Sequence, residues 1–185
     1  MELERSIPAS GACFNKTSAF IEAMKSPPYH VFSASWPAPN SCGMSISANT
    51  NGSLGTVLDS WSYASTSGVH GLALREADGK QLIYSADLNG DKVWTHAVDR
   101  ASGKVSEVGR FSTSRGSMHP RHLAVHSNGK YLYVLMENDN TLVQYDLVQQ
   151  TGSAVREGAR YLLYPKGEIY GGVVMQKTFR RVREC

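Results

Sequence analysis

The sequence lacks any hydrophobic run that approaches the ~20 residues of a membrane-spanning helix, so it predicts no membrane partner. No apolar stretch follows a basic start, and we therefore expect no signal peptide. Only three cysteines are present, Cys13, Cys42 and Cys185, and their spacing is neither that of metal ligands nor that of a redox pair. This scarcity favours reduced thiols in a cytoplasmic protein. The Gly-x-Ser-x-Gly elbow of serine hydrolases is also absent.

The excess of positive over negative charge is small as well. The net charge is +3, and the basic excess is concentrated in the stretch Lys177–Cys185 instead of on a repeating face, which argues against a nucleic-acid partner. His119, His122 and His126 lie within eight residues. Their spacing fits neither a helical zinc pair nor a zinc ribbon, so we expect no metal ion.

What the sequence does contain is a unit of about fifty residues that occurs twice almost in full. One copy begins at His70 and the other at Arg121, and both consist of short runs rich in Val, Ile, Tyr and Leu separated by turn-forming pairs such as Asn-Gly and Ser-Gly. Gly79-Lys80 of the first copy aligns with Gly129-Lys130 of the second. A weaker copy, around Val31-Phe32 and Gly52, precedes them.

Each unit predicts a four-stranded antiparallel meander. The expected strands are Gly71–Leu74, Gln81–Ser85, Lys92–Val98 and Val105–Phe111 in one copy, and Leu123–Val125, Tyr131–Leu135, Leu142–Asp146 and Ala154–Tyr161 in the next. A period of this length built from short strands is typical of a β-propeller blade. Helical repeats would show an apolar period of 3.6 residues, which is absent from these units. An antiparallel sandwich is the alternative.

The predicted fold class is therefore all-β, a β-propeller fragment of about three four-stranded blades. We assign the blades to residues 28–162, after an N-terminal segment 1–27 that contains a short helix from Lys16 to Lys25, and before a divergent basic tail 163–185. Propellers close with about four to eight blades, so three would leave apolar blade faces open. The chain is then part of a propeller shortened by a truncated gene model, a degenerate copy, or a protomer whose self-association covers those faces.

The repeat alignment selects polar residues for examination. His70 and Arg121 both stand where a first strand begins, and because the first strand of a propeller blade lines the central channel, we expect the two side chains to meet at the channel mouth. An imidazole and a guanidinium together would bind an anion. The alignment also pairs Asp87 with Glu137 at the ends of second strands. The Leu-Asn-Gly that follows Asp87 favours a turn-capping role for that carboxylate, whereas Glu137 stays a candidate for a channel site.

Four strings in the sequence carry a family resemblance. They are Gly68-Val-His-Gly71, Tyr84-Ser-Ala-Asp-Leu-Asn-Gly-Asp-Lys-Val-Trp-Thr-His96, His119-Pro-Arg-His122, and Leu135-Met-Glu137. Together they resemble the fungal 3-carboxy-cis,cis-muconate lactonizing enzymes, or carboxy-cis,cis-muconate cyclases. These belong to the seven-bladed lactonase-type propellers, which also include bacterial 6-phosphogluconolactonases. The resemblance runs from roughly Lys16 to Asp146.

The resemblance implies an isomerase of aromatic catabolism that needs no cofactor. A carboxylate of a small polycarboxylate substrate adds across a conjugated double bond to form a γ-lactone, and a proton is delivered to the adjacent carbon. By motif position, the family's histidine, arginine and glutamate map to His70, Arg121 and Glu137, with His119 and His122 as further substrate-binding candidates. His70 and Glu137 are both candidates for the proton donor and for the group that orients it.

Two other functions fit the same pattern. One is a lactonase that hydrolyses 6-phosphogluconolactone-like substrates, which would require additional basic residues for the phosphate. The other is an inactive propeller remnant that serves as a binding module, because fold alone does not fix function.

Overall fold

The computed structural model describes residues 7–36, 38–77, 79–113, 116, 118–148 and 151–163. They form three four-stranded antiparallel sheets, here called blades 1 to 3, preceded by the 3-10 turn η1 (Gly11–Cys13). Blade 1 consists of β1 (Ser18–Ala23), β2 (Tyr29–Ser35), β3 (Cys42–Ala48) and β4 (Leu54–Ser62). Blade 2 consists of β5 (Val69–Ala77), β6 (Lys80–Asp87), β7 (Lys92–Val98) and β8 (Val105–Ser112). Blade 3 consists of β9 (Pro120–Val125), β10 (Tyr131–Met136), β11 (Thr141–Leu147) and β12 (Ala154–Leu162).

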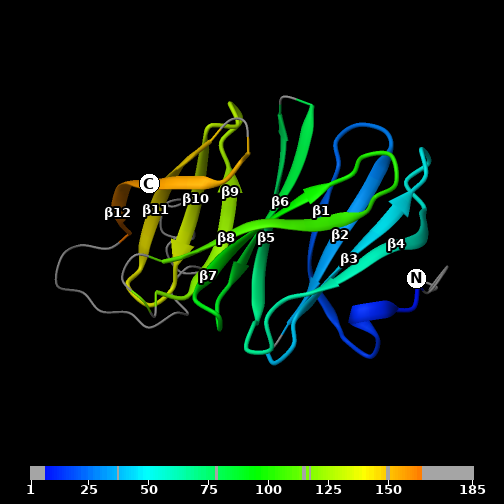
Figure 1. Ribbon diagram of the computed structural model, residues 1–185, viewed down its shortest axis with the longest axis horizontal. Helices are drawn as coiled ribbons and strands as arrows, with labels where there is room; N and C mark the ends of the chain where they lie inside the picture. The colour runs from blue at the N-terminus through cyan, green and yellow to red at the C-terminus, as the bar shows by residue number, and fades with distance from the viewer. Residues whose placement is uncertain are drawn as a thin grey trace, which may run out of the picture.

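The three blades stand side by side in chain order, with blade 2 in the middle (Figure 1). Strands pair with their sequence neighbours inside each sheet, and the first strands β1, β5 and β9 lie next to one another. This arrangement confirms the predicted all-β fold of about three propeller blades. It excludes the sandwich, in which two sheets share a single core, because the middle sheet is covered by a core cluster on each of its two faces.

The hydrophobic core lies between the blades. Side chains of β6 alternate across the middle sheet, so that Leu82 and Tyr84 pack toward blade 3 whereas Ile83 packs toward blade 1. The run from Gln81 to Asp87 is therefore buried on both faces. This burial explains why Leu82, Ile83 and Tyr84 follow one another without alternating polar residues, as expected for a blade with a neighbour on each side.

Glycines at equivalent outer turns let the blades approach closely. Gly103 and Gly152 have φ angles of 72° and 70°, a region that L side chains rarely adopt. A Cβ at Gly152 would lie 1.8 Å from a Leu82 methyl group of the neighbouring blade. The carbonyl of Gly152 also accepts a 2.6 Å hydrogen bond from the Tyr84 hydroxyl, which fixes the two blades to each other.

The predicted helix from Lys16 to Lys25 is wrong, because this segment contains β1, the inner strand of blade 1. Ala, Glu, Met and Lys give it a high helix propensity, but pairing with β2 over Ser18–Ala23, with a bulge after Ser18, overrides that preference. Blade 1 consequently begins at Ser18, ten residues before the predicted start at residue 28.

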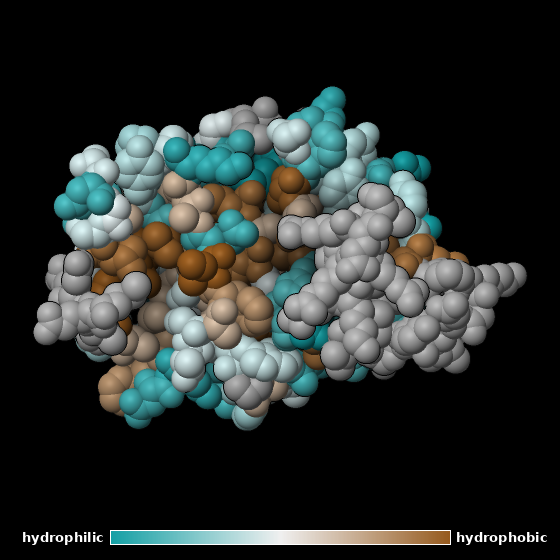
Figure 2. All heavy atoms as spheres, turned by 180° about the vertical axis from the view of Figure 1, so that it is seen from behind, coloured by the Kyte–Doolittle hydropathy of each residue, from teal (hydrophilic) through white to brown (hydrophobic). Residues whose placement is uncertain are grey.

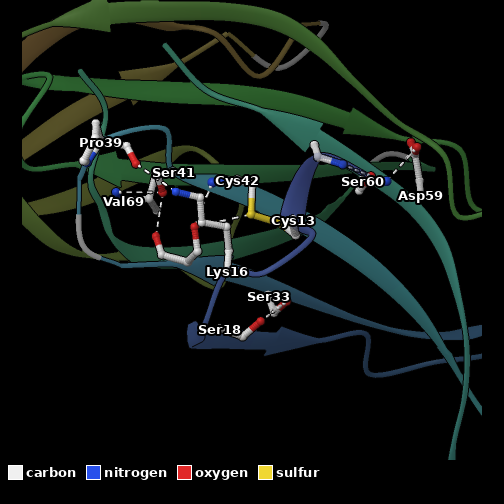
Figure 3. The surroundings of a disulfide bond; sticks show 12 residues. Cys13, Lys16, Ser18, Ser33, Pro39, Ser41, Cys42, Asp59, Ser60 and Val69 are labelled. Carbon is white, nitrogen blue, oxygen red and sulfur yellow. Dashed lines mark hydrogen bonds between the residues drawn. A yellow bond between two sulfur atoms is a disulfide. The ribbon is translucent and has the colours of Figure 1, made fainter. Parts of the chain in front are cut away.

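The expectation of reduced thiols is wrong for two of the three cysteines. Cys13 and Cys42 form a disulfide that joins η1 to the start of β3, and both residues are buried (Figure 3). The same segment is held by a hydrogen bond from the Ala12 amide to Ser60 Oγ and by one from Lys16 Nζ to the Pro39 carbonyl. The third cysteine, Cys185, and the basic tail lie outside the described residues, apart from Leu163.

Some hydrophobic side chains reach the solvent. On the face seen in Figure 2, hydrophobic residues lie at the surface between polar margins. The exposed large hydrophobic residues of the described part of the chain include Ile21 on β1 and Leu162 on β12. No helix within the described ranges has the length and apolarity required to cross a membrane.

His96 on β7 gives a prediction for acid sensitivity. The ring is 2% exposed, packs among Trp61, Tyr63 and Trp94, and its Nδ1 has no hydrogen-bond partner. Burial lowers the pKa of His96 to about 4, whereas a histidine in the unfolded chain titrates near ~6.5. Between these values the unfolded chain binds a proton that the folded chain does not, so the free energy of unfolding falls as the pH drops, by about 3 kcal/mol in all.

Denaturant unfolding at several pH values between 7 and 4 would measure this loss. The variants His96→Phe and His96→Gln cannot titrate and should both reduce the pH slope, irrespective of how each changes stability at pH 7. An unchanged slope in both variants would contradict a neutral, buried His96.

Candidate active site

A bulge at the same place in all three inner strands builds the candidate site. In each first strand, two successive ladder positions are separated by one extra residue: Ala19 in β1, His70 in β5 and Arg121 in β9. A bulge turns the extra side chain away from its ladder neighbours, and such bulges are frequent next to functional sites. His70 and Arg121 are therefore structurally equivalent, as the repeat alignment predicted.

The predicted pairing of Asp87 with Glu137 is wrong by one residue. Asp87 pairs with Val69 and Met136 pairs with Pro120, at the same ladder position of their blades. Glu137 is instead the residue after the strand, equivalent to Leu88 in blade 2 and Trp36 in blade 1. Because strand side chains alternate between faces, this one-residue difference leaves Asp87 buried and places the Glu137 carboxylate beside Arg121.

Asp87 is a structural residue. It is fully buried, and its carboxylate accepts hydrogen bonds from Ser67 Oγ, the amides of Gly68 and Gly90, and Trp94 Nε1. The interpretation of Asp87 as a turn-capping carboxylate is confirmed by the Gly90 contact, and the carboxylate also holds the loop that leads into β5.

Arg121 and Glu137 form the charged part of the site. Arg121 Nη1 donates a 2.7 Å hydrogen bond to Glu137 Oε1, and the two side chains are 27% and 21% exposed. Both can therefore be reached from solvent while being only partly solvated. An incoming carboxylate could bind this guanidinium beside Glu137.

His70 lies in a cluster of rings. Its imidazole centroid is 4.7 Å from the ring of Phe20, 4.9 Å from that of Trp36 and 5.2 Å from that of His122. These contacts come from all three blades, because Phe20 and Trp36 belong to blade 1 and His122 to blade 3. His70 Nδ1 is buried and has no hydrogen-bond partner.

The cluster keeps both imidazoles neutral near pH 7. Desolvation lowers the pKa of His70, the positive charge of Arg121 lowers it further, and the Glu137 carboxylate partly opposes these effects. The pKa of His122 is lowered in the same way, first by desolvation and then by His70 and Arg121. Negative charge brought to Arg121 by a ligand would raise both pKa values again.

His119 contributes through its backbone. Its amide donates to Asp91 Oδ1 at 3.0 Å and its carbonyl accepts from the Glu137 amide at 3.0 Å, so it fixes the backbone on which Glu137 stands. The φ angle of His119 is 53°. Of the five candidate residues, the structure thus brings together the side chains of His70, Arg121, His122 and Glu137, and ties the backbone of His119 to Glu137.

Two glycines make room for the cluster. A Cβ at Gly71 would lie 2.6 Å from the Arg121 carbonyl oxygen, so β5 and β9 approach this closely only with glycine there. A Cβ at Gly68 would lie 2.8 Å from the Trp36 ring, so the indole rests directly on the Gly68 backbone. The Gly-Val-His-Gly string therefore places His70 between two close approaches.

Phe20 and Trp36 were missed from the sequence. Register offers a signal for both, since Phe20 is equivalent to His122, and Trp36 to Glu137. The predicted helix hid the inner strand of blade 1, and with it these equivalences. Among the described residues, no group of three or more His, Cys, Asp or Glu side chains is placed to hold a metal ion.

Comparisons with known proteins agree with this architecture. Residues 62–173 match the model of a family described as lactonase, 7-bladed beta-propeller. The chain is 33% identical to carboxy-cis,cis-muconate cyclase from Neurospora crassa over 159 residues, which are 86% of this chain and 43% of the fungal enzyme. It is 32% identical to muconate cycloisomerase 1 from Cutaneotrichosporon cutaneum over 81 residues, or 44% of this chain and 21% of that protein.

Solved structures show the same fold. The periplasmic gluconolactonase of Pseudomonas aeruginosa superimposes with a TM-score of 0.66 at 19% identity, over 85% of this chain and 45% of that one. The chain thus spans less than half the length of the relatives it matches.

Proposed function

The chain belongs to the lactonase family of seven-bladed β-propellers, and from this premise we propose that it carries the catalytic blades of a carboxy-cis,cis-muconate cyclase. The observation that carries the proposal is the convergence of the Arg121–Glu137 ion pair with the neutral imidazole of His70. These residues stand at bulges and strand ends of adjacent blades. The muconate cyclase from Neurospora crassa, at 33% identity, supports the same reaction.

The proposed reaction is an intramolecular addition. One carboxylate oxygen of the substrate forms a bond to a carbon of the conjugated diene, and the displaced electron pair moves toward a second carboxylate. A proton then reaches the carbon next to the new bond, so the product is an isomer of the substrate. No electrons are gained or lost, so the reaction requires no redox cofactor.

Arg121 would bind the carboxylate on which negative charge develops. A single donor aimed at such charge is worth about 3 kcal/mol of the barrier in other enzymes. A bound polyanion would also offset the positive charge that lowers the pKa of His70, so that the imidazole gains proton affinity when substrate arrives. His70 and Glu137 are then the two candidates for proton delivery, with His119 and His122 as neighbouring binding residues.

The test is turnover of 3-carboxy-cis,cis-muconate by this chain, followed by loss of the diene absorbance. We expect Arg121→Ala to lower kcat/KM about 100-fold. Arg156→Ala is a matched control, because Arg156 forms a 2.7 Å ion pair with Asp146 on the exposed part of blade 3 and should leave activity unchanged. No turnover by a folded, soluble sample would contradict the proposed activity.

The oligomeric state and the lactonase activity of the same sample test the other proposals. We propose that this catabolic enzyme acts on a small polycarboxylate, and that self-association of the chain covers its open blade faces. Sedimentation of the active sample should therefore show more than one protomer. Hydrolysis of 6-phosphogluconolactone in place of cyclisation would instead identify a lactonase.

A further inference from the structure

The three blades supply chemically different residues at the same repeat positions. At the bulge and the residue after it, blade 1 has Ala19 and Phe20, whereas blade 3 has Arg121 and His122. At the position after the second strand, blade 1 has Trp36 where blade 3 has a carboxylate. The site is therefore charged on one side and aromatic on the other, with His70 between them.

We propose that Phe20 and Trp36, together called the aromatic wall, select planar unsaturated carboxylates and orient them with the carboxylate at Arg121 and the conjugated carbons against blade 1. The inference rests on the proposed function and adds to it a specificity determinant and a direction of binding. It assigns the wall to a part of the chain that no catalytic motif includes.

The geometry of the wall supports this role. The rings of Phe20 and Trp36 both contact the His70 imidazole, at 4.7 and 4.9 Å between centroids, and Phe20 also lies 6.4 Å from the ring of His122. Both wall residues are partly buried; Phe20 also packs against the core cluster between blades 1 and 2, and part of each residue stays accessible to a ligand. Flat π surfaces favour other flat, conjugated groups over flexible saturated chains.

The position of Trp36 is built into the fold. Its indole rests on the Gly68 backbone, where any side chain would collide with the ring. The residue of blade 3 that is equivalent to Gly68 is His119. The Leu88 amide donates to the Gly68 carbonyl in blade 2, and the Glu137 amide donates to the His119 carbonyl in blade 3. Glycine at this place in blade 2 thus leaves room for the indole of the preceding blade.

The experiment compares two non-reacting six-carbon dicarboxylates of equal charge, trans,trans-muconate and adipate, which differ in the conjugated diene. Calorimetric titration of this chain should show that muconate binds about tenfold more tightly. The double variant Phe20→Leu/Trp36→Leu should lose most of that preference, with little change in its affinity for adipate. The single variant Trp36→Phe, which keeps an aromatic ring at both positions, should retain much of the preference. Arg121→Ala should weaken both ligands alike and keep the preference.

The contrary outcomes are distinct. A preference that the double variant retains would come from the rigidity of the ligand and would overturn the wall, as would absence of any preference in the folded wild-type chain. Cyclase turnover without a preference for muconate would contradict the role of the aromatic wall and support the proposed reaction. A preference that depends on the wall, without turnover, would support the wall and contradict the proposed reaction. Thermal melts of each variant show whether it is folded.

Discussion

Replacing Asp87 with alanine should lower the free energy of unfolding by about 4 kcal/mol or more. The carboxylate is fully buried and accepts four hydrogen bonds, from Ser67, Gly68, Gly90 and Trp94. Alanine would leave these donors without an acceptor. The bonds from Ser67, Gly68 and Trp94 are buried, and each buried donor left unpaired costs about 1–3 kcal/mol. Because domains of this size have a total stability of only about 5–15 kcal/mol, the variant should unfold in far less denaturant.

Asp87→Asn distinguishes the contributions of the two carboxylate oxygens. The amide oxygen can keep the bonds from Gly68 and Gly90, which both go to Oδ1, whereas the amide nitrogen would face the Trp94 N–H as a second donor. We therefore expect a loss between wild type and the alanine variant. A stability for Asp87→Ala within about 1 kcal/mol of wild type would contradict the network.

The same network bears on the site. Asp87 holds the Gly68 amide, and Gly68 supports the Trp36 ring and stands two residues before His70. A weakened loop would let both rings move. Asp87→Ala, which removes the acceptor of the Gly68 amide, should therefore also reduce turnover through His70, even at temperatures where it is folded.

The blades could be predicted because their signal is local. Turn-forming glycines such as Gly103 and Gly152 recur at a fixed place, and the apolar runs between them are long enough to mark strands. The equivalence of His70 and Arg121 followed from the same alignment, because both precede the variable part of the first hairpin.

The equivalent residues of the second strands can be matched only when the pairing register of each first hairpin is known. The β5–β6 hairpin joins Leu72 to Ser85, and the β9–β10 hairpin joins Leu123 to Val134, so the first is two residues longer. An alignment that places a single residue of slack there is displaced by one after the turn, and a displacement of one exchanges the faces of a strand. Such an alignment therefore matches Asp87 with Glu137 in place of Met136.

The cysteine pair could not be predicted because its proximity is tertiary. Cys13 and Cys42 are 29 residues apart, and they meet because η1 folds back on β3 and β4. The expectation of a cytoplasmic protein depended on reduced thiols, and a disulfide is typical of oxidising compartments, so the pairing removes that support.

Loss of the disulfide should lower the free energy of unfolding by about 3.5 kcal/mol. That is the chain-entropy value for a closed loop of the 29-residue separation between Cys13 and Cys42. The double variant Cys13→Ala/Cys42→Ala should show this loss in denaturant unfolding without reductant. Dithiothreitol should destabilise wild type by a similar amount and leave the variant unchanged, because the variant has no bond to reduce.

A thiol count makes this prediction decisive. Wild type unfolded without reductant should expose one reactive thiol, that of Cys185, whereas three would contradict the disulfide. The bond lies just before β1, whose Phe20 contacts His70, and β1 pairs only with β2 in its sheet. Releasing η1 should therefore weaken the binding of planar ligands as well as the fold, since the strand that carries half of the aromatic wall loses its anchor.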